Sequence, residues 1–444
     1  MADYRRIADR VAGDIASGRL RPGQQLPPQR VFARQRGIAG STAGRVYAEL
    51  VRRGLVVGEV GRGTFVRAAA AGPYGRAIVE AATSAPVNLE LNYPSAPGQS
   101  EQLAPALAPL LRPDVLTEAL RPAPATGTAA AREAVADLLA TPAWRPDPDR
   151  VLFSGNARQA IAATLASLVR PGGRVGVEPL TYPLVREIAG RLGVTLVALE
   201  VDGDGLLRPE SVVAAQRTAP LSALYLQPTL HNPTSVTTGE ARKREIADVV
   251  RELGLPVVED RIWSFLHPDS PAPLAACAPG LVHVVDGLSK RVAPGLTVGF
   301  LVVPEGRVDA VGVAIRSGGW SAGRFALEAG VRWMADGTVE RLVAAKREDA
   351  AARQRLVAEE LGEFAVRADP LTYYAWWELP VPWRADTFTA AAAAHGIAVT
   401  PGTAFSVDPK VTPNGVRLGL ASAAVPDLRR ALRVLAGLAR GGAG

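Results

Sequence analysis

The stretch "VVDGLSKRVAPGLTVGF", residues 284–300, places one lysine between two apolar runs that are rich in valine and glycine. Lysine is scarce in this chain: of the 50 basic residues only Lys243, Lys290, Lys346 and Lys410 are lysines. A lysine amine in an apolar pocket can lose its proton and attack an aldehyde, which an arginine guanidinium cannot do. A solvated surface lysine is the simpler alternative. The pattern therefore raises the hypothesis that the amine of Lys290 has a covalent role.

Short apolar runs alternate with helical patterns on both sides of this stretch. Segments such as "ARQAIAATLASLVR" and "TGEARKREIADVVREL" separate the runs. Apolar strands that alternate with helices predict a parallel α/β sheet covered on both faces, and ligands bind such sheets at the carboxyl ends of the strands. The β-prone runs are "RVLFSG", "RVGVEP", "TLVALEV", "ALYLQP", "PVVED", "LVHVVD" and "VGFLVVP".

Length and composition narrow the class of protein. A chain of 444 residues is too long for one ordinary core, and 48% hydrophobic with 21% charged residues is typical of globular proteins. The single cysteine, Cys277, excludes an internal disulfide framework, and four scattered histidines give no metal-ligand spacing. No apolar stretch is long enough to span a bilayer, and the amphipathic N-terminus contains acidic residues, unlike a secretion signal. We expect a cytoplasmic protein without a metal site or a membrane partner.

The positive charge is concentrated at one end of the chain. Residues 1–68 contain 13 arginines and 5 acidic residues, whereas the remainder contains 37 basic and 38 acidic side chains. The net charge of +7 therefore comes entirely from the first 68 residues. A compact basic module on a nearly neutral body predicts a polyanionic partner for that module. The alternative is that the excess charge serves solubility alone.

The basic module has the pattern of three helices followed by a β-hairpin. The helical segments are "YRRIADRVAGDIASG", "LPPQRVFARQRG" and "STAGRVYAELVRRG", and the inner stripe of the third is Val46, Leu50 and Val51. The last two segments, joined by a tight turn, predict a helix-turn-helix whose second helix, roughly residues 41–53, enters the major groove. Two β-prone runs around "GRG" then predict a wing with Arg62 at its tip.

This module resembles the winged helix-turn-helix of the GntR regulators over about residues 3–67. The segment "LPPQR", Thr42, Tyr47 and "GRGTFV" follow one another in the family's order, and we expect Tyr47 in the core. Gly40 stands where the family usually has an arginine, so Arg45 is expected to take more of the DNA contact. The resemblance implies a double-stranded DNA operator, with phosphate contacts from Arg30 and Arg62 and base-edge contacts from Ser41, Thr42 and Arg45.

Several predicted strands of the second part end in polar residues. "LFSGNARQAIAATL" is a strand, a turn of small residues and a helix, whose first amides near Ala157 and Arg158 form an anion site. "PVVED" ends a strand with Asp260, and "HNPTS" places Asn232 after another strand. Each motif alone has an ordinary explanation, because Asp260 can cap a helix and an Asn-Pro pair commonly forms a turn.

The order of these motifs resembles that of fold-type I pyridoxal-phosphate aminotransferases over roughly residues 88–440. The phosphate turn, the aromatic residue after "VEPLTYP", Asn-Pro-Thr, the strand-end Asp, Ser-Lys and "VRLGLA" follow one another. The resemblance implies pyridoxal 5'-phosphate as cofactor, with Lys290 as the Schiff-base lysine and Asp260 paired with the pyridinium nitrogen. Arg417 would clamp a ligand carboxylate. The other implied cofactor-binding residues are Asn232 at the ring hydroxyl, Tyr182 on the ring face, Ala157 and Arg158 at the phosphate, and Ser289.

The combination of the two domains is identified as the architecture of the MocR subfamily of transcription regulators. The expected fold class is α/β, with a winged helix-turn-helix over residues 1–68 and a linker rich in Ala, Pro, Gly and Ser over residues 69–99. Residues 100–444 are expected to form a fold-type I transferase-like domain with a mainly parallel central sheet and a smaller C-terminal α/β subdomain. The resemblance also implies a head-to-tail homodimer that senses an amino-acid-like or amine effector.

Three positions depart from the aminotransferase pattern. Thr297 replaces a phosphate-binding arginine, Trp263 replaces a tyrosine that bonds the ring hydroxyl, and Pro122 replaces a further tyrosine. Each lost charge-assisted bond to the phosphate costs about 1 to 3 kcal/mol unless it is compensated, and we expect Arg158 or Arg291 to compensate. The expectation is therefore a protein that binds the cofactor but transaminates poorly.

Three functions stay open at this point. The first is a DNA-binding regulator that binds pyridoxal phosphate and an amino-acid-like effector. The second is a catalytically active aminotransferase with a basic DNA-binding appendage. The third is a regulator that has abandoned the cofactor, or senses pyridoxal phosphate itself. The charge asymmetry and the three departures favour the first, in which at most a residual half-reaction remains.

Overall fold

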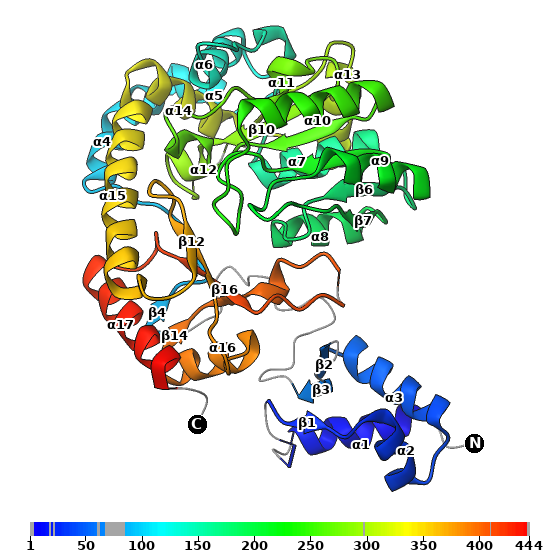
Figure 1. The fold of residues 1–444 in the computed structure, drawn as a ribbon. Coiled ribbons are helices and arrows are strands. Elements are labelled where there is room, and N and C mark those ends of the chain that lie inside the picture. Colours follow the sequence, from blue (N-terminus) through cyan, green and yellow to red (C-terminus); the bar gives the residue numbers. More distant parts are fainter. Residues whose placement is uncertain are drawn as a thin grey trace.

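The computed structural model describes residues 4–16, 19–20, 23–59, 63–66, 85–295, 298–408 and 410–441. The chain forms a small N-terminal domain and a larger body of two parts (Figure 1). In the described ranges, no helix combines the length and the apolar composition that crossing a membrane requires. Two positions singled out above, Arg62 and Thr297, lie outside these ranges.

The N-terminal domain folds around three helices and a three-stranded antiparallel sheet with the order β1-β3-β2. Gly37 ends the second helix in the left-handed conformation, φ 60°, which glycine adopts without steric strain. The predicted helix-turn-helix with a following hairpin is confirmed. The elements are α1 (Tyr4–Ala16), β1 (Gln25–Leu26), α2 (Gln29–Arg36), α3 (Gly40–Arg52), β2 (Val56–Glu59) and β3 (Gly63–Val66).

The inner face of α3 differs by one residue from the predicted stripe. Val46 and Leu50 are fully buried, as expected, but Val51 is 39% exposed, so its assignment to the core was wrong. Tyr47 is buried as predicted, and its hydroxyl donates a hydrogen bond to the main-chain carbonyl of Pro27. Each residue advances roughly 100° around a helix, which places position 51 beyond the face shared by positions 46, 47 and 50.

The seven predicted β-runs form one seven-stranded sheet with the order β5-β11-β10-β9-β8-β6-β7. All neighbouring strands are parallel except that β11 runs antiparallel to β5 and β10. The expected mainly parallel sheet is therefore confirmed. The strands are β5 (Val151–Ser154), β6 (Arg174–Val177), β7 (Thr195–Ala198), β8 (Ala223–Leu226), β9 (Val257–Asp260), β10 (Val282–Gly287) and β11 (Gly299–Val302).

Helices cover both faces of this sheet (Figure 1). Phe153 of β5 packs in the core that contains Val135 and Trp333, whereas its neighbour Leu152 packs in the core that contains Ile161 and Val311. Successive residues of a strand point to opposite faces, so both faces need a cover. The helices of this part are α4 (Gln99–Leu107), η1 (Ala108–Leu111), α5 (Pro113–Ala119), α6 (Ala129–Leu139), η2 (Pro148–Arg150), α7 (Ala157–Leu168), α8 (Pro183–Arg191), α9 (Pro209–Thr218), α10 (Glu240–Leu253), η3 (Ser264–Leu266), α11 (Leu274–Cys277), α12 (Leu288–Arg291), α13 (Val308–Ser317) and α14 (Arg324–Ala335).

A smaller part at the C-terminus contains an antiparallel sheet with the order β12-β13-β16-β15 and two covering helices. The 24-residue helix α15 joins the two parts, because Leu342 lies in the core of the large sheet and Leu356 in the core of the small one (Figure 1). The elements are α15 (Thr338–Leu361), β12 (Val366–Ala368), β13 (Tyr374–Glu378), α16 (Ala385–Ala394), β14 (Ile397–Ala398), β15 (Thr400–Pro401), η4 (Gly402–Ala404), β16 (Gly415–Gly419) and α17 (Val425–Gly441).

The predicted linker, residues 69–99, needs a correction at its C-terminal end. Residues 67–84 lie outside the described ranges, but β4 (Val87–Asn88) pairs in parallel with β14, and Leu89 is fully buried in the core of the smaller part. The Ala, Pro and Ser content of the segment concealed this alternation of buried and half-buried residues. Residues 85–99 therefore belong to the body.

The N-terminal domain touches the smaller part at the start of α16. The guanidinium of Arg384 lies 4.3 Å from the ring centroid of Phe65 in β3. Thr387 approaches Gly23 so closely that a Cβ on Gly23 would lie 3.0 Å from the threonine methyl group. The DNA-binding module is thus in direct contact with the body.

Candidate functional site

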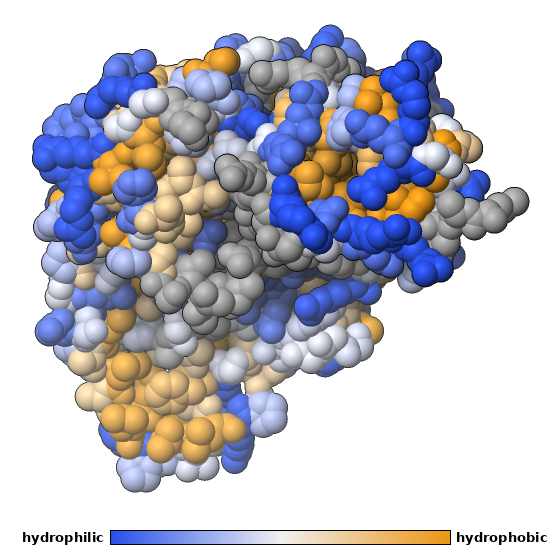
Figure 2. Space-filling view, turned by 90° about the horizontal axis from the view of Figure 1, so that it is seen from below, coloured by the Kyte–Doolittle hydropathy of each residue, from blue (hydrophilic) through white to orange (hydrophobic). Residues whose placement is uncertain are grey.

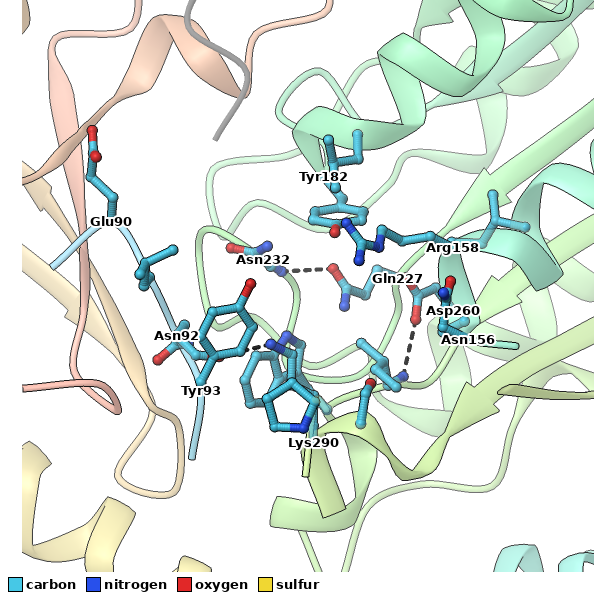
Figure 3. Close-up of a pocket in the computed structure, with 18 of the residues that line it drawn as sticks. Glu90, Asn92, Tyr93, Asn156, Arg158, Tyr182, Gln227, Asn232, Asp260 and Lys290 are labelled. Carbon is cyan, nitrogen blue, oxygen red and sulfur yellow. Dashed lines mark hydrogen bonds between the residues drawn. The ribbon is translucent and has the colours of Figure 1, made fainter. Parts of the chain in front are cut away.

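A cavity of about 410 Å³ lies where the carboxyl ends of the large sheet meet the smaller part. Its walls come from the segments after β5, β8 and β9, from α12, from β16 and from residues 90–93 (Figure 3). All eight residues predicted for the cofactor and the effector line it: Ala157, Arg158, Tyr182, Asn232, Asp260, Ser289, Lys290 and Arg417.

The turn before α7 places the start of a helix at the cavity. Asn156 caps the helix, since its side-chain oxygen accepts a hydrogen bond of 2.9 Å from the amide of Gln159. Ala157 and Arg158 are the first two residues of α7, where main-chain amides point out of the helix start, and both residues line the cavity. Gly299 of β11 packs against this turn so tightly that a Cβ there would lie 2.3 Å from the carbonyl carbon of Asn156. The neighbouring strand thus fixes the turn.

Asp260 is the last residue of β9 and is 2% exposed. Its carboxylate accepts hydrogen bonds of 2.7 Å from the hydroxyl of Tyr225 and 3.0 Å from the amide of Ile262. Burial raises the pKa of Asp260 to about 6, although both hydrogen bonds oppose that shift. A ligand cation beside this carboxylate would stabilise its ionised form, so the position suits a pyridinium nitrogen.

The amine of Lys290 lies in the cavity between two aromatic rings (Figure 3). Its Nζ donates a hydrogen bond of 2.7 Å to the main-chain carbonyl of Asn92. The same atom lies 4.4 Å from the ring centroid of Tyr93 and 5.2 Å from that of Trp263. A carbonyl oxygen and the faces of aromatic rings both attract a cation. The side chain is therefore held in the cavity by residues from two different segments.

Arg417 lies on β16 and is 3% exposed. Its guanidinium donates hydrogen bonds to the main-chain carbonyl of Glu90 and, at 3.2 Å, to the hydroxyl of Thr400, and it lies 5.5 Å from the ring centroid of Phe405. Burial lowers the pKa of Arg417 to about 10. A buried cation of this kind is stabilised by an anionic ligand, and a guanidinium pairs well with a carboxylate.

These groups fit pyridoxal phosphate. Lys290 would offer an amine to the aldehyde, Asp260 a buried carboxylate to the ring nitrogen, and the start of α7 donors to the phosphate. The side-chain oxygen of Asn232 is buried and has no hydrogen-bond partner in the described part of the chain. A buried polar atom without a protein partner is uncommon and is explained when a ligand supplies the bond. The ring of Tyr182 lies next to the side chain of Arg158 in the same cavity (Figure 3).

Comparison with known families agrees with this geometry. The family model for aminotransferase class I and II matches residues 116–435. The chain belongs to this family. A second model, for bacterial regulatory proteins of the gntR family, matches residues 3–66. A gntR-type helix-turn-helix is thus fused to an aminotransferase domain, which is the domain combination of the MocR subfamily.

Individual relatives show the same two-domain arrangement or the same fold. YdeF of Bacillus subtilis (strain 168), an uncharacterized HTH-type transcriptional regulator, is 28% identical over 434 residues, 97% of this chain and 93% of YdeF. PdxR of Corynebacterium glutamicum, an HTH-type pyridoxine biosynthesis transcriptional regulator, is 23% identical over 364 residues, 80% of this chain and 78% of PdxR. The structure of LysN, an α-aminoadipate aminotransferase of Thermus thermophilus complexed with N-(5'-phosphopyridoxyl)-L-leucine, has 22% identity and a TM-score of 0.71, covering 80% of this chain and 92% of LysN.

Three positions bear on how this chain departs from the aminotransferase pattern. Trp263 is buried and presents its indole to Lys290 in place of the expected tyrosine. Arg158 or Arg291 was expected to compensate at the phosphate, but the guanidinium of Arg291 pairs with buried Asp286, lies over the ring of Phe265 and does not line the cavity. Of the two candidate arginines, Arg158 alone lines the cavity. The third departure, Pro122, is exposed and does not line it.

Sequence reasoning missed part of the cavity wall. Glu90, Asn92 and Tyr93 lie in the segment assigned to the linker, although the alternation in "VNLELNYP" was a usable signal. Gln227 follows β8, where its side-chain oxygen accepts a hydrogen bond of 2.9 Å from the amide of Asn232. Ligands bind at the carboxyl ends of parallel strands, so the position of Gln227 after β8 was as informative as that of Asp260 at the end of β9.

The predicted DNA contacts lie on the N-terminal domain. Arg30, Ser41 and Arg45 are exposed and Thr42 is half-buried, while Arg62 lies outside the described residues. Ser41 and Arg45 are four residues apart on α3 and so share one face of the helix. In the view from below, hydrophilic side chains cover much of this domain (Figure 2). By contrast, the arginines at the end of α3 pair with an acidic residue of the same helix: Arg52 and Arg53 contact Glu49 at 2.5 and 2.8 Å.

Proposed function

We propose that this protein is a DNA-binding transcription regulator whose aminotransferase domain binds pyridoxal 5'-phosphate and senses an amino-acid-like or amine effector. The observation that carries the proposal is the meeting of an amine, a buried carboxylate, a helix start and a buried arginine in one cavity, in a chain with a gntR-type first domain. The names of YdeF and PdxR as transcriptional regulators, and the reference to pyridoxine in the second, support it.

Each residue of the cavity has a role in this proposal. The bound cofactor supplies an electrophilic carbon, to which an amine attaches with loss of one water. Arg417 orients the effector by pairing with its carboxylate. The cofactor is held by the amine of Lys290 at the aldehyde, Asp260 at the ring nitrogen, Asn232 at the ring hydroxyl, Tyr182 on the ring face, Ala157 and Arg158 at the phosphate, and Ser289 beside the lysine.

The amine of Lys290 links the cofactor to the start of the body. When it carries its protons, it contacts Asn92 and the ring of Tyr93. Bonding to the cofactor would remove at least two of those protons and weaken that contact, and release of the Lys290 amine by an effector would restore it. The contacted segment follows the linker from the DNA-binding domain, so the exchange favours one domain arrangement over another by differential affinity.

The DNA-binding domain acts in this proposal as one of two reading heads. We propose a head-to-tail homodimer, which presents two such domains to paired half-sites and gains affinity through effective concentration. The DNA-contacting residues are Arg30, Ser41, Thr42, Arg45 and Arg62.

The test follows the visible spectrum and the DNA affinity of the full-length protein together. The protein, loaded with pyridoxal phosphate, is titrated with a panel of amino acids and amines, and its affinity is measured for a DNA fragment selected from a random pool. We expect one of these compounds to change both the visible spectrum and the DNA affinity. Lys290→Ala should abolish both responses but keep the DNA affinity, whereas Lys410→Ala, at an exposed lysine, should change neither.

Two outcomes would contradict this proposal. A normal absorption band in Lys290→Ala would exclude the covalent role of Lys290. Steady transfer of amino groups to a keto acid at enzymatic rates would assign the protein as an active aminotransferase with a DNA-binding appendage.

A further inference from the structure

A second lysine is directly connected to the segment that carries Lys290. Lys346 lies in α15 and is 0% exposed. Its Nζ donates hydrogen bonds to three consecutive main-chain carbonyls, those of Lys290 at 3.1 Å, Arg291 at 2.9 Å and Val292 at 2.7 Å. An ammonium group has three protons and no acceptor, so the three carbonyls match its full donor capacity.

These carbonyls need a partner because of the shape of α12. The helix is a single turn, Leu288–Arg291, so the carbonyls at its end have no amide of a following turn to accept from. A cation at the C-terminal end of a helix satisfies such carbonyls. Lys346 therefore holds the end of the turn from which the side chain of Lys290 enters the cavity.

Lys346 is itself firmly placed. Its neighbours along α15, Leu342 and Ala350, are fully buried in the core of the large sheet. The hydroxyl of Tyr373 donates a hydrogen bond of 2.7 Å to the main-chain carbonyl of Lys346. In the described part of the chain no carboxylate forms an ion pair with the Lys346 ammonium, so the carbonyls of α12 are what offset its burial.

We propose that Lys346 is a positioning residue: it fixes the backbone at the end of α12 so that the amine of Lys290 reaches the cofactor's aldehyde. The inference rests on the proposed function, because it takes Lys290 as the residue that bonds to the cofactor. A single ammonium nitrogen directs its three donors at three neighbouring carbonyls, whereas a guanidinium spreads its donors over a planar fork, which accounts for a lysine here in a chain with 46 arginines.

The test compares two forms of the cofactor on the full-length protein. Pyridoxal phosphate can bond to Lys290, but pyridoxamine phosphate carries an amine in place of the aldehyde and cannot. Lys346→Met should lower the affinity for pyridoxal phosphate about tenfold relative to that for pyridoxamine phosphate. Lys243→Met is the matched control, because Lys243 is also buried and its ammonium donates to the carbonyls of Pro271 and Ala272, which do not line the cavity.

The affinity ratio separates positioning from a general loss of structure. Thermal unfolding is measured for both variants, and Lys346→Gln, which keeps two donors, replaces Lys346→Met if the latter does not fold. If the ratio of the affinity for pyridoxal phosphate to that for pyridoxamine phosphate falls in the Lys346 variants but not in Lys243→Met, the inference is supported. A ratio that stays constant, or two affinities that fall in parallel, would overturn it. The proposed function is checked separately: if Lys290→Ala leaves the ratio unchanged, the covalent assignment of Lys290 fails first.

Discussion

Positively charged residues of the N-terminal domain and of the body lie in opposite surroundings. Arg30 and Arg45 are exposed, whereas Arg417 is 3% exposed. Water and salt screen exposed charges, so each contributes a modest, nearly additive and salt-dependent amount to the binding of a polyanion. A buried charge interacts strongly with a few partners at fixed positions. Arginine thus suits DNA affinity in one region and ligand selectivity in the other, and the following substitutions test this distinction.

The largest effect is expected at Arg417. Arg417→Ala removes a buried cation that would pair with a carboxylate, so the affinity for the responding amino acid should fall about a hundredfold, as for two charge-assisted hydrogen bonds. Binding of the cofactor and of DNA should change little. Titration followed by the visible spectrum measures the affinity, and Arg367→Ala, on strand β12 of the same sheet, is the control. Undiminished affinity in Arg417→Ala would show that the carboxylate binds elsewhere.

A buried negative charge should give the next largest effect. The pKa of Asp260 is about 6 in the folded protein against an ordinary 3.8. The folded state therefore binds this proton more tightly than the unfolded chain, so ionisation of Asp260 destabilises the fold above pH 6, and the penalty disappears toward pH 4. Asp260→Asn should raise the free energy of unfolding of the cofactor-free protein by about 2 kcal/mol at pH 8 and change it little at pH 4.

Denaturant unfolding at the two pH values measures this effect, with Asp309→Asn, at an exposed aspartate, as the control. The same Asp260→Asn variant should bind pyridoxal phosphate more weakly, because the ring nitrogen loses its ionic partner. A stability gain of equal size at both pH values would be incompatible with a titrating carboxylate as the cause.

The exposed charges should show a smaller and salt-dependent effect. Arg30→Ala removes one phosphate contact, so the slope of log affinity against log salt should become shallower by about 0.9. Binding to a selected DNA fragment at several salt concentrations measures the slope. Arg52→Ala, which removes an arginine that is paired with Glu49, should leave the slope unchanged. Equal slopes for Arg30→Ala and the unchanged protein would remove Arg30 from the DNA interface.

The smallest effect is expected inside the N-terminal domain. Tyr47→Phe keeps the buried ring but removes the hydroxyl that donates to Pro27, which should cost about 1 kcal/mol of stability. Calorimetry of the full chain measures the transition of this domain, with Tyr4→Phe, at a half-buried tyrosine, as the control. If both variants unfold alike, the bond to Pro27 adds nothing beyond what water supplies.

The large sheet could be predicted because the pattern that forms each strand lies within a few consecutive residues. Each of its strands is a short apolar run, and a strand covered on both faces needs such a run. The direction of β11 could not be predicted, because it depends on how the chain returns after α12, and an apolar run has the same pattern in either direction. The strand β4 was missed because the Ala, Pro and Ser content of the segment concealed the alternation in "VNLELNYP".

The cavity was predictable where topology alone brings residues together. Asp260 and Asn232 follow strands of one sheet, and the ends of parallel strands meet at one edge. Tyr93 and Lys346 were missed because their contacts with the segment around Lys290 join positions far apart in the sequence. Arg291 was expected at the cavity because it directly follows Lys290 in the sequence. Successive residues of a helical turn point in different directions, so the side chain of Arg291 leaves the cavity.

The most direct test of the central claim is chemical trapping of the cofactor. The full-length protein is incubated with pyridoxal phosphate, reduced with borohydride, digested and examined by mass spectrometry. We expect a pyridoxyl-phosphate adduct on the peptide that contains Lys290, and none on the peptides that contain Lys243, Lys346 or Lys410. An unmodified Lys290 peptide from the reduced, cofactor-treated protein would contradict the account.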